Sequence, residues 1–283
     1  MLVGTKAIAL KKDQGLVVKP LRQKIIQDPG STTGGMLTLT NDSDQPLTVE
    51  LTSENFGVIN ESYDYSFKSD ESSGWVRFVD PVVQLEPREK RKISYSLAVP
   101  VSATPGGYDI ALMSTIKSKS FDSTASEYHR VASLLYLDVN GDAERKGSIL
   151  TFDLPWLTTG RNLEYTLRMA NQGNTHLEFD IRLNSSLFWG GNDKQDTTKT
   201  LTLPRSVRSL SGAIDIGLVP GIYSVKATYS PPQGNKQVLT KRVLYIPWTF
   251  TWSIILLIAI IVFAGVERRK VFSKKQSKPK KTP

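Results

Sequence analysis

An all-β ectodomain of two tandem immunoglobulin-like β-sandwiches, followed by one C-terminal transmembrane α-helix, is the fold class that this sequence predicts. Three observations predict it. Apolar and polar residues alternate through most of residues 16–246, with Asn, Gly, Pro and Ser clusters between the runs, which is typical of an antiparallel sandwich. Two turn motifs occur once in each half of the chain. Residues 248–266 carry no charged side chain and precede a basic tail.

Period-two alternation of apolar residues predicts the individual strands. The clearest cases are residues 37–40, 47–51, 93–99, 163–169, 177–183 and 222–229. Residues 131–139 form a longer apolar run, which favours a strand that is buried on both faces or covered by a neighbour. No segment before the apolar stretch at 248–266 shows a sustained stripe with the 3.6-residue period of a helix.

The two halves of the chain share an asparagine motif. Asn41 precedes a polar turn, and Leu47 opens the next strand six residues later. Asn171 and Leu177 have the same spacing around a second polar turn. We interpret the two stretches as equivalent positions of a repeated sandwich.

A Pro-Gly-x-Tyr motif also occurs in both halves, at residues 105–108 and 220–223. Proline and glycine suit a type II turn, after which the tyrosine begins a strand, so we interpret the motif as a folding signal. The asparagine and the motif are 64 residues apart in the first half and 49 apart in the second. The polar, Ser-rich residues 53–73 are the predicted place of the extra residues.

These patterns divide the chain into six parts. We predict an N-terminal segment at 1–15, a first immunoglobulin-like sandwich at 16–140, a linker at 141–147, a second immunoglobulin-like sandwich at 148–246, a transmembrane helix at 248–266 and a basic cytoplasmic tail at 267–283. Ala7-Ile8-Ala9 has the small-x-small form of a signal-peptide cleavage site. The N-terminal segment is therefore either the remnant of a truncated signal peptide or an ordinary frayed end.

The apolar stretch is predicted to anchor the chain in a membrane. As a helix, residues 249–266 would span about 27 Å, close to the hydrocarbon thickness of a bilayer. Trp248 and Trp252 suit the headgroup level at one end, and Arg268, Arg269 and Lys270 mark the cytoplasmic side at the other. We expect a single-pass protein of the cell membrane, with the N-terminal ectodomain outside. The alternative is a buried core helix.

Charge and cysteine content narrow the class of protein. The chain has 36 Lys and Arg against 27 Asp and Glu, but residues 267–283 hold eight of the basic and one of the acidic side chains. The basic character therefore belongs to the tail, which we expect to be disordered near anionic lipid, and we predict no nucleic-acid partner. An exported chain without cysteine suits a bacterial cell surface better than a disulfide-rich receptor.

Catalysis and metal binding find little support in the sequence. His129 and His176 are the two histidines, and no Gly-x-Ser-x-Gly elbow accompanies them. We expect His176 to be exposed in a polar turn. Residues 138–142 carry oxygen ligands at alternating positions, but the EF-hand glycine and glutamate are replaced by Ala143 and Ile149. We predict no enzyme activity, no cofactor and no metal; an inter-domain cation site is the alternative at this linker.

Aromatic residues give the candidate ligand site. Tyr63, Tyr65 and Phe67 alternate within the predicted insertion, and Trp189 lies in an apolar loop of the second half. Exposed rings among polar residues can stack on sugar rings or bury against a protein partner. Trp75 alternates with a buried face and is interpreted as core.

The order of features resembles the WxL-interacting protein family of bacterial surfaces. The resemblance rests on residues 28–31 before the strand at 37–41, on Val-Pro at 99–100 with Pro-Gly-Gly-Tyr at 105–108, and on residues 130–142. It implies an export signal, an immunoglobulin-like peptidoglycan-binding domain, a second β-sandwich, one C-terminal span and a basic tail. No binding residue is carried over from the family.

We therefore predict a non-catalytic, membrane-anchored bacterial surface protein that binds cell-wall glycan or a surface protein through its ectodomain. The lipid bilayer is its first partner, and peptidoglycan or a surface protein its second. The alternatives are an accessory subunit of a membrane enzyme or secretion complex, and an adhesin for a neighbouring cell.

Topology gives the first testable prediction. A cysteine introduced at Ser69 should react with impermeant thiol reagents in intact cells, whereas one at Ser277 should be shielded, because the basic flank holds the tail inside. The chain has no cysteine of its own, so the labelling has no background. Labelling at Ser277 but not at Ser69 would show the opposite orientation.

Overall fold

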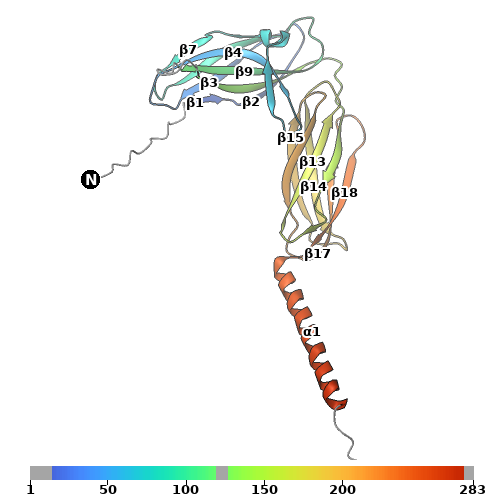
Figure 1. Cartoon of the computed structure of the whole chain (residues 1–283). Coiled ribbons are helices and arrows are strands. Elements are labelled where there is room, and N and C mark those ends of the chain that lie inside the picture. The colour runs from blue at the N-terminus through green and yellow to red at the C-terminus, as the bar shows by residue number, and fades with distance from the viewer. Residues whose placement is uncertain (1–14, 119–126, 277–283) are drawn as a thin grey trace, which may run out of the picture.

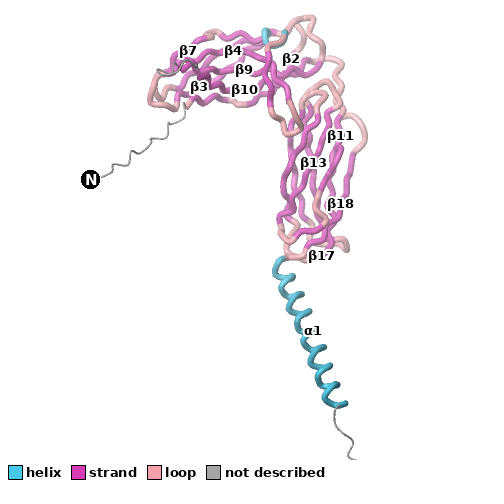
Figure 2. The backbone as a smooth tube through the Cα atoms, viewed as in Figure 1, coloured by secondary structure: helices cyan, strands magenta, loops and turns pink. Residues whose placement is uncertain are grey.

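The structure is a computed structural model, and it describes residues 15–118 and 127–276. Two β-sandwiches follow one another along the chain, and a long helix leaves the far end of the second sandwich (Figure 1). The first sandwich lies across the near end of the second (Figure 2). The fold class predicted from the sequence, two tandem immunoglobulin-like sandwiches and one C-terminal apolar helix, is confirmed.

The first sandwich consists of two facing sheets. One has the strand order β1-β3-β8-β6, and the other has the order β2-β10-β9-β4-β5, with β7 also paired to β4. The strands are β1 (Leu16–Lys19), β2 (Arg22–Gln27), β3 (Thr32–Asn41), β4 (Leu47–Val58), β5 (Tyr65–Lys68), β6 (Val76–Phe78), β7 (Val82–Leu85), β8 (Lys90–Ala98), β9 (Gly106–Ser118) and β10 (Glu127–Val139).

The second sandwich repeats this topology. Its sheets have the orders β11-β13-β16 and β12-β18-β17-β14-β15. In both sandwiches the first strand pairs antiparallel in one sheet and the second strand pairs parallel in the other. The strands are β11 (Gly147–Asp153), β12 (Leu157–Thr158), β13 (Asn162–Asn171), β14 (Leu177–Leu187), β15 (Lys194–Thr202), β16 (Val207–Asp215), β17 (Gly221–Tyr229) and β18 (Gln237–Tyr245).

The paired asparagines confirm the predicted repeat. Asn41 and Asn171 each end the third strand of a sandwich, β3 and β13, and are almost fully buried. Each side-chain amide donates to three backbone carbonyls, those of Gln45, Leu85 and Glu86 in the first sandwich and of Thr175, Thr202 and Leu203 in the second. A buried amide that satisfies three carbonyls fixes the turn after its strand, which is why both halves keep it.

Each sandwich has its own apolar core, built by the predicted alternation. Along β14 every second residue from Leu177 to Leu187 is buried. In β10, residues 133–139 are all buried, which confirms the expectation for the long apolar run. One face of β10 packs in the first core, and the other face meets Leu203 of the second sandwich.

The extra residues of the first sandwich lie between β4 and β7, at 59–81, overlapping the predicted stretch and extending past it. They contain β5, β6 and a short 3-10 helix, η1 (Glu71–Trp75). Asp70 caps η1 by accepting from the backbone N–H of Glu71 at 2.7 Å. Asn55 on β4 accepts from the backbone N–H of Ser73 at 3.0 Å. The insertion is thus fixed to the sandwich at a defined place.

The C-terminal helix α1 (Trp248–Gln276) begins three residues after β18. Its window Trp248–Gly265 has a mean hydropathy of 2.2 and is not buried against the sandwiches, so it is long and apolar enough to span a bilayer. The helix continues ten residues past the predicted end at 266, because Glu, Arg and Lys are good helix formers that extend an existing helix. The expectation that the whole basic tail is disordered is wrong for 267–276; residues 277–283 lie outside the described part.

The two motif tyrosines occupy matching positions. Tyr223 is fully buried and donates to the carbonyl of Val219 at 2.7 Å. Tyr108 is half-buried and donates to the carbonyl of Thr104 at 3.0 Å. In both cases the hydroxyl closes the turn four residues upstream.

The depth of these two rings predicts unequal effects of substitution. Tyr223→Ala should destabilise the second sandwich by roughly 3–5 kcal/mol, as for other large buried rings. Tyr108→Ala should cost the first sandwich clearly less, because its ring is partly exposed. Hydrogen exchange should show lost protection confined to the sandwich that carries the change. Equal losses in both sandwiches would contradict the division into two cores.

Candidate functional site

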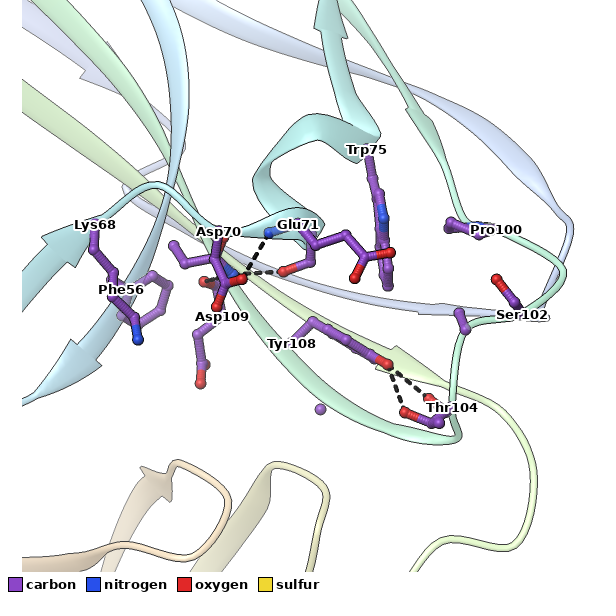
Figure 3. A pocket seen from close by; sticks show the side chains of 14 residues that line it. Phe56, Lys68, Asp70, Glu71, Trp75, Pro100, Ser102, Thr104, Tyr108 and Asp109 are labelled. Atoms are coloured by element: carbon purple, nitrogen blue, oxygen red, sulfur yellow. Dashed lines mark hydrogen bonds between the residues drawn. The ribbon is translucent and has the colours of Figure 1, made fainter.

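A cleft with a volume of about 410 Å³ opens on the first sandwich, between the insertion and the loop before β9 (Figure 3). Trp75 and Tyr108 form one wall, with ring centroids 4.6 Å apart and a tilt of 52°. Lys68, Asp70 and Glu71 line it from the insertion. The cleft therefore combines an aromatic surface with charged groups that donate and accept hydrogen bonds.

Local structure holds the aromatic wall in place. Trp75 ends η1 and is buried in the first core. Tyr108 follows the Pro-Gly-Gly turn at the start of β9, and its hydroxyl lies 2.9 Å from Oγ1 of Thr104. The same hydroxyl is bonded to the Thr104 carbonyl, as Figure 3 shows. The wall is therefore preorganised, which lowers the entropy cost of ordering it around a ligand.

The deep side of the cleft reaches the contact between the two sandwiches. Asp109, which lines the cleft, also contacts the second sandwich through its carboxylate. Nε2 of His176 lies 2.8 Å from Oδ1 of Asp109, and Nδ1 lies 2.7 Å from Oδ1 of Asp138. Lys24 adds a contact of 3.1 Å to the other oxygen of Asp138.

The His176 side chain has no exposed surface, so the expectation that it lies exposed in a polar turn is wrong. Its turn does project from the second sandwich, but it docks on strands β9 and β10 of the first. A turn that looks solvated in sequence is covered here by the other sandwich. Neither carboxylate stands near it in the chain, and only the folded arrangement brings the three groups together.

The charges of this cluster shift its pKa values in defined directions. Burial lowers the pKa of His176, but its hydrogen bonds and charge interactions with both aspartates outweigh burial and raise it. Burial raises the pKa of Asp109. Burial acts upward on Asp138 too, yet the bonds and charge of His176, with Lys24, hold its pKa below the usual value. Each ring nitrogen of His176 thus lies within hydrogen-bonding distance of a carboxylate oxygen, and these contacts raise the pKa of the imidazole despite its burial.

Tyr63 lies in a second contact between the sandwiches. Its side chain is 7% exposed, and its hydroxyl accepts from the backbone N–H of Leu203 at 2.9 Å. The guanidinium of Arg208 lies over its ring at 4.2 Å. Tyr63 precedes β5 and has a φ of 68°, a left-handed conformation that the surrounding contacts must hold. In this structure the ring packs against the second sandwich and is closed to solvent.

Of the other predicted ligand residues, Tyr65 and Phe67 share strand β5, and the Tyr65 ring contacts that of Tyr63 with centroids 6.4 Å apart, whereas Trp189 lies in the other sandwich. Tyr65 is half-buried and packs edge-on against Phe56 at 5.5 Å. Phe67 is 37% exposed on the edge strand β5. Trp189 is 65% exposed in the loop after β14 of the second sandwich. The structure does not gather the four rings into one surface, and ligand binding by them stays a prediction.

The predicted anchor residues all fall on helix α1. Trp248 and Trp252 are exposed on its first turns and contact each other with ring centroids 6.4 Å apart. Arg268, Arg269 and Lys270 continue the same helix. The arrangement agrees with the order of features expected of an anchor, and the membrane itself stays a prediction.

Sequence reasoning missed the residues of the cleft. Trp75 was assigned to the core and Tyr108 to a folding signal, and both assignments hold, yet the same rings form the cleft wall. Trp75 lies within the insertion that distinguishes the first repeat from the second, and Tyr108, whose ring packs against it, lies outside the insertion. That contrast between repeats is the signal that could have pointed to them.

Within residues 15–118 and 127–276, no group of three or more His, Cys, Asp or Glu side chains is arranged to hold a metal ion. Asp138 would be the first ligand of the alternative cation site at 138–142. Its carboxylate is instead bonded to His176 and Lys24. Both oxygens of that carboxylate are occupied by protein donors.

No family model and no curated protein matches the sequence. Solved structures are similar in fold. The class 5 fimbriae chaperone CfaA is 10% identical over 82% of this chain and 100% of its own, with a TM-score of 0.40. A chain of the CsuC–CsuE chaperone–tip subunit complex from Csu pili of Acinetobacter baumannii is 12% identical over 82% and 99%, with a TM-score of 0.41. The CupB2 chaperone of Pseudomonas aeruginosa is 12% identical over 80% and 99%, with a TM-score of 0.37.

All three TM-scores lie below 0.5, and all three identities are 12% or less. None of the comparisons points to the WxL-interacting protein family in particular.

The His176 cluster predicts a pH-dependent contact between the sandwiches. A raised histidine pKa means that its contribution is complete below about 6.5, the ordinary value, and is lost as the pH rises through the raised pKa. The lowered pKa of Asp138 means that its contribution is lost as the pH falls below the ordinary 3.8. The raised pKa of Asp109 acts in the opposite direction and offsets part of the gain.

Spin labels attached at Ser69→Cys and Asn235→Cys would measure the distance between the two sandwiches as a function of pH. The distribution of distances between the sandwiches should be narrow in mildly acidic buffer and broaden as the pH rises through the histidine pKa. His176→Gln should broaden it at every pH and remove the transition. A distribution that does not change with pH in the unsubstituted chain would contradict the prediction.

Proposed function

We propose that this chain is a single-pass, membrane-anchored, non-catalytic surface protein whose first sandwich binds cell-wall glycan in the cleft beside η1. The observation that carries the proposal is the composition of that cleft: the Trp75–Tyr108 pair beside Lys68, Asp70 and Glu71. Sugar rings present an apolar face to aromatic rings and hydroxyl groups to charged ones. Contacts between two aromatic rings contribute roughly 0.5–1.5 kcal/mol beyond area burial, and we borrow this scale for each ring that stacks on a sugar.

The shape of the site supports glycan over a protein partner. A cleft of about 410 Å³ falls within the size range of small-ligand sites. A stable protein interface needs about 800 Å² of surface on each partner, far more than the rim of such a cleft offers. A surface protein bound elsewhere on the ectodomain, as in an accessory subunit or an adhesin, is the competing proposal.

In this proposal the other parts of the chain hold the cleft at a distance from the membrane. In the proposal, helix α1 anchors the chain, the basic residues after it lie in the cytoplasm, and the second sandwich holds the first one away from the bilayer. The domain division at 16–140, 141–147 and 148–246 and a relationship to WxL-interacting proteins belong to the same proposal. The distance between cleft and membrane is then set by one folded spacer rather than by a flexible linker.

Sedimentation with insoluble peptidoglycan tests the proposed function. The detergent-solubilised full chain should pellet with the wall, and Lys68→Ser with Glu71→Gln should weaken its binding by at least about tenfold, because charged hydrogen bonds of about 1.5–3 kcal/mol are lost. Both side chains are exposed, so their loss should leave the fold intact.

A matched control makes the same charge changes elsewhere. Lys92→Ser with Glu86→Gln alters exposed residues of the first sandwich that do not line the cleft, and it should bind normally. If Tyr65→Ser with Phe67→Ser abolishes binding while the cleft variant binds normally, the edge strand β5 is the site instead. A full chain that stays in the supernatant would refute wall binding, and stoichiometric capture of a membrane protein would favour the accessory subunit.

A further inference from the structure

Large apolar side chains gather at one end of the second sandwich. Between residues 140 and 246, the described structure leaves nine large hydrophobic residues exposed, and seven of them lie in or next to three loops. These loops cover residues 154–161, 188–193 and 216–221. The seven are Trp156, Leu157, Phe188, Trp189, Leu218, Val219 and Ile222. We call this group of seven the basal patch.

The three loops lie at the same end of the sandwich and are joined by hydrogen bonds. The backbone N–H of Ile216 donates to the carbonyl of Arg161 at 3.0 Å, and that of Phe188 donates to the carbonyl of Ile222 at 2.8 Å. The Asn192 amide donates to the carbonyl of Ile216 at 3.0 Å. The basal patch is therefore carried by a connected surface rather than by three independent loops.

This end is also where the anchor begins. Gly221, at the start of β17, pairs with Tyr245, and Trp248 opens helix α1 three residues later. Figure 1 shows α1 leaving the sandwich at this end. Because the strand and the helix are joined by only Ile246 and Pro247, the basal patch cannot lie far from the point where the helix enters a membrane.

Side-chain exposure and charge both suit a lipid surface. Trp156 is 74%, Trp189 65% and Leu218 68% exposed. The three loops carry only two charged residues, Arg161 and Asp193. Tryptophan prefers the headgroup level of a bilayer, and apolar loop tips gain by burial at the acyl boundary.

The opposite end of the same sandwich provides the contrast. The turn between β17 and β18, residues 230–236, is Ser-Pro-Pro-Gln-Gly-Asn-Lys and contributes no large exposed hydrophobic residue. Seven of the nine exposed large hydrophobic residues lie at the end that meets the anchor, and a general surplus of apolar surface would not be concentrated there. The asymmetry follows the position of the helix.

We infer that the basal patch inserts into the headgroup region of the membrane that α1 spans, so that the second sandwich sits on the bilayer instead of swinging above it. This inference rests on the membrane anchoring in the proposed function. It assigns Trp189 to lipid and leaves the cleft of the first sandwich as the glycan site. Contact through the helix and three loops fixes the tilt of the ectodomain.

Tryptophan quenching in vesicles tests the inference with the full chain. The vesicles contain phosphatidylcholine brominated near the headgroup end of its acyl chains. Trp75, buried in the first sandwich, is kept in every variant as background, and one further tryptophan is kept: Trp189, Trp156 or Trp248, with the others changed to Phe. A matched control carries Asn235→Trp, at the polar end of the second sandwich, as its only added tryptophan.

Trp189 and Trp156 should lose at least half as much fluorescence as Trp248, and the Asn235→Trp control should lose none. If Trp248 is quenched while Trp189 and Trp156 match the control, the chain is anchored but the inference is wrong, and a protein partner becomes the occupant of the patch. If Trp248 is also unquenched, the anchor and the inference fail together.

A second measurement leaves all native tryptophans in place. Leu218→Cys, labelled with an environment-sensitive dye, should show a blue-shifted emission in vesicles. The control is the same chain with the dye at Asn235→Cys, which should show no such shift. Equal emission at the two positions would overturn the inference independently of the quenching result.

Discussion

The buried imidazole of His176, held between Asp109 and Asp138 of the neighbouring sandwich, is the contact on which the arrangement of the molecule depends. Burying charged groups is costly unless each is paired and hydrogen-bonded, so this contact stabilises one docking geometry and disfavours others. A methyl group at Gly107 would lie 2.9 Å from Cε1 of His176, which shows how closely the two sandwiches approach. Because Asp109 also lines the cleft, the proposed ligand site and the contact between sandwiches share a side chain.

The insertion gives the first sandwich two features that the second lacks: contacts to the other sandwich and one side of the cleft. Near its start, Tyr63 and Glu61 contact the second sandwich, where Glu61 accepts from Arg168 at 2.7 Å. Near its end, η1 supplies Trp75 and the charged side of the cleft. The second sandwich has a short hairpin loop at the corresponding place, and it has neither feature. One inserted stretch therefore accounts for the divergence of two otherwise equivalent sandwiches.

Local patterns were enough to predict the strands with clear alternation, the repeat and the apolar helix, because alternation, the Asn41 and Asn171 motifs and an uncharged stretch of helical length are properties of neighbouring residues. Strands such as β16 and β18 were not predicted individually. The cleft and the His176 cluster were beyond such reasoning. His176 is separated by 38 and 67 residues from its two carboxylates, and its burial comes from a second sandwich that no local pattern describes. The length of α1 was underestimated, because a charged sequence can continue a helix that an apolar one has begun.

The direct passage from β18 into α1 makes the second sandwich a mechanical element. A pull on the first sandwich is carried to helix α1 through this strand. Its neighbour β17 pairs with it over nine residues, and β12 pairs with it in parallel near the anchor. Tension along the strand loads these hydrogen bonds together in shear rather than one after another. The second sandwich therefore resists tension directed along β18 and helix α1.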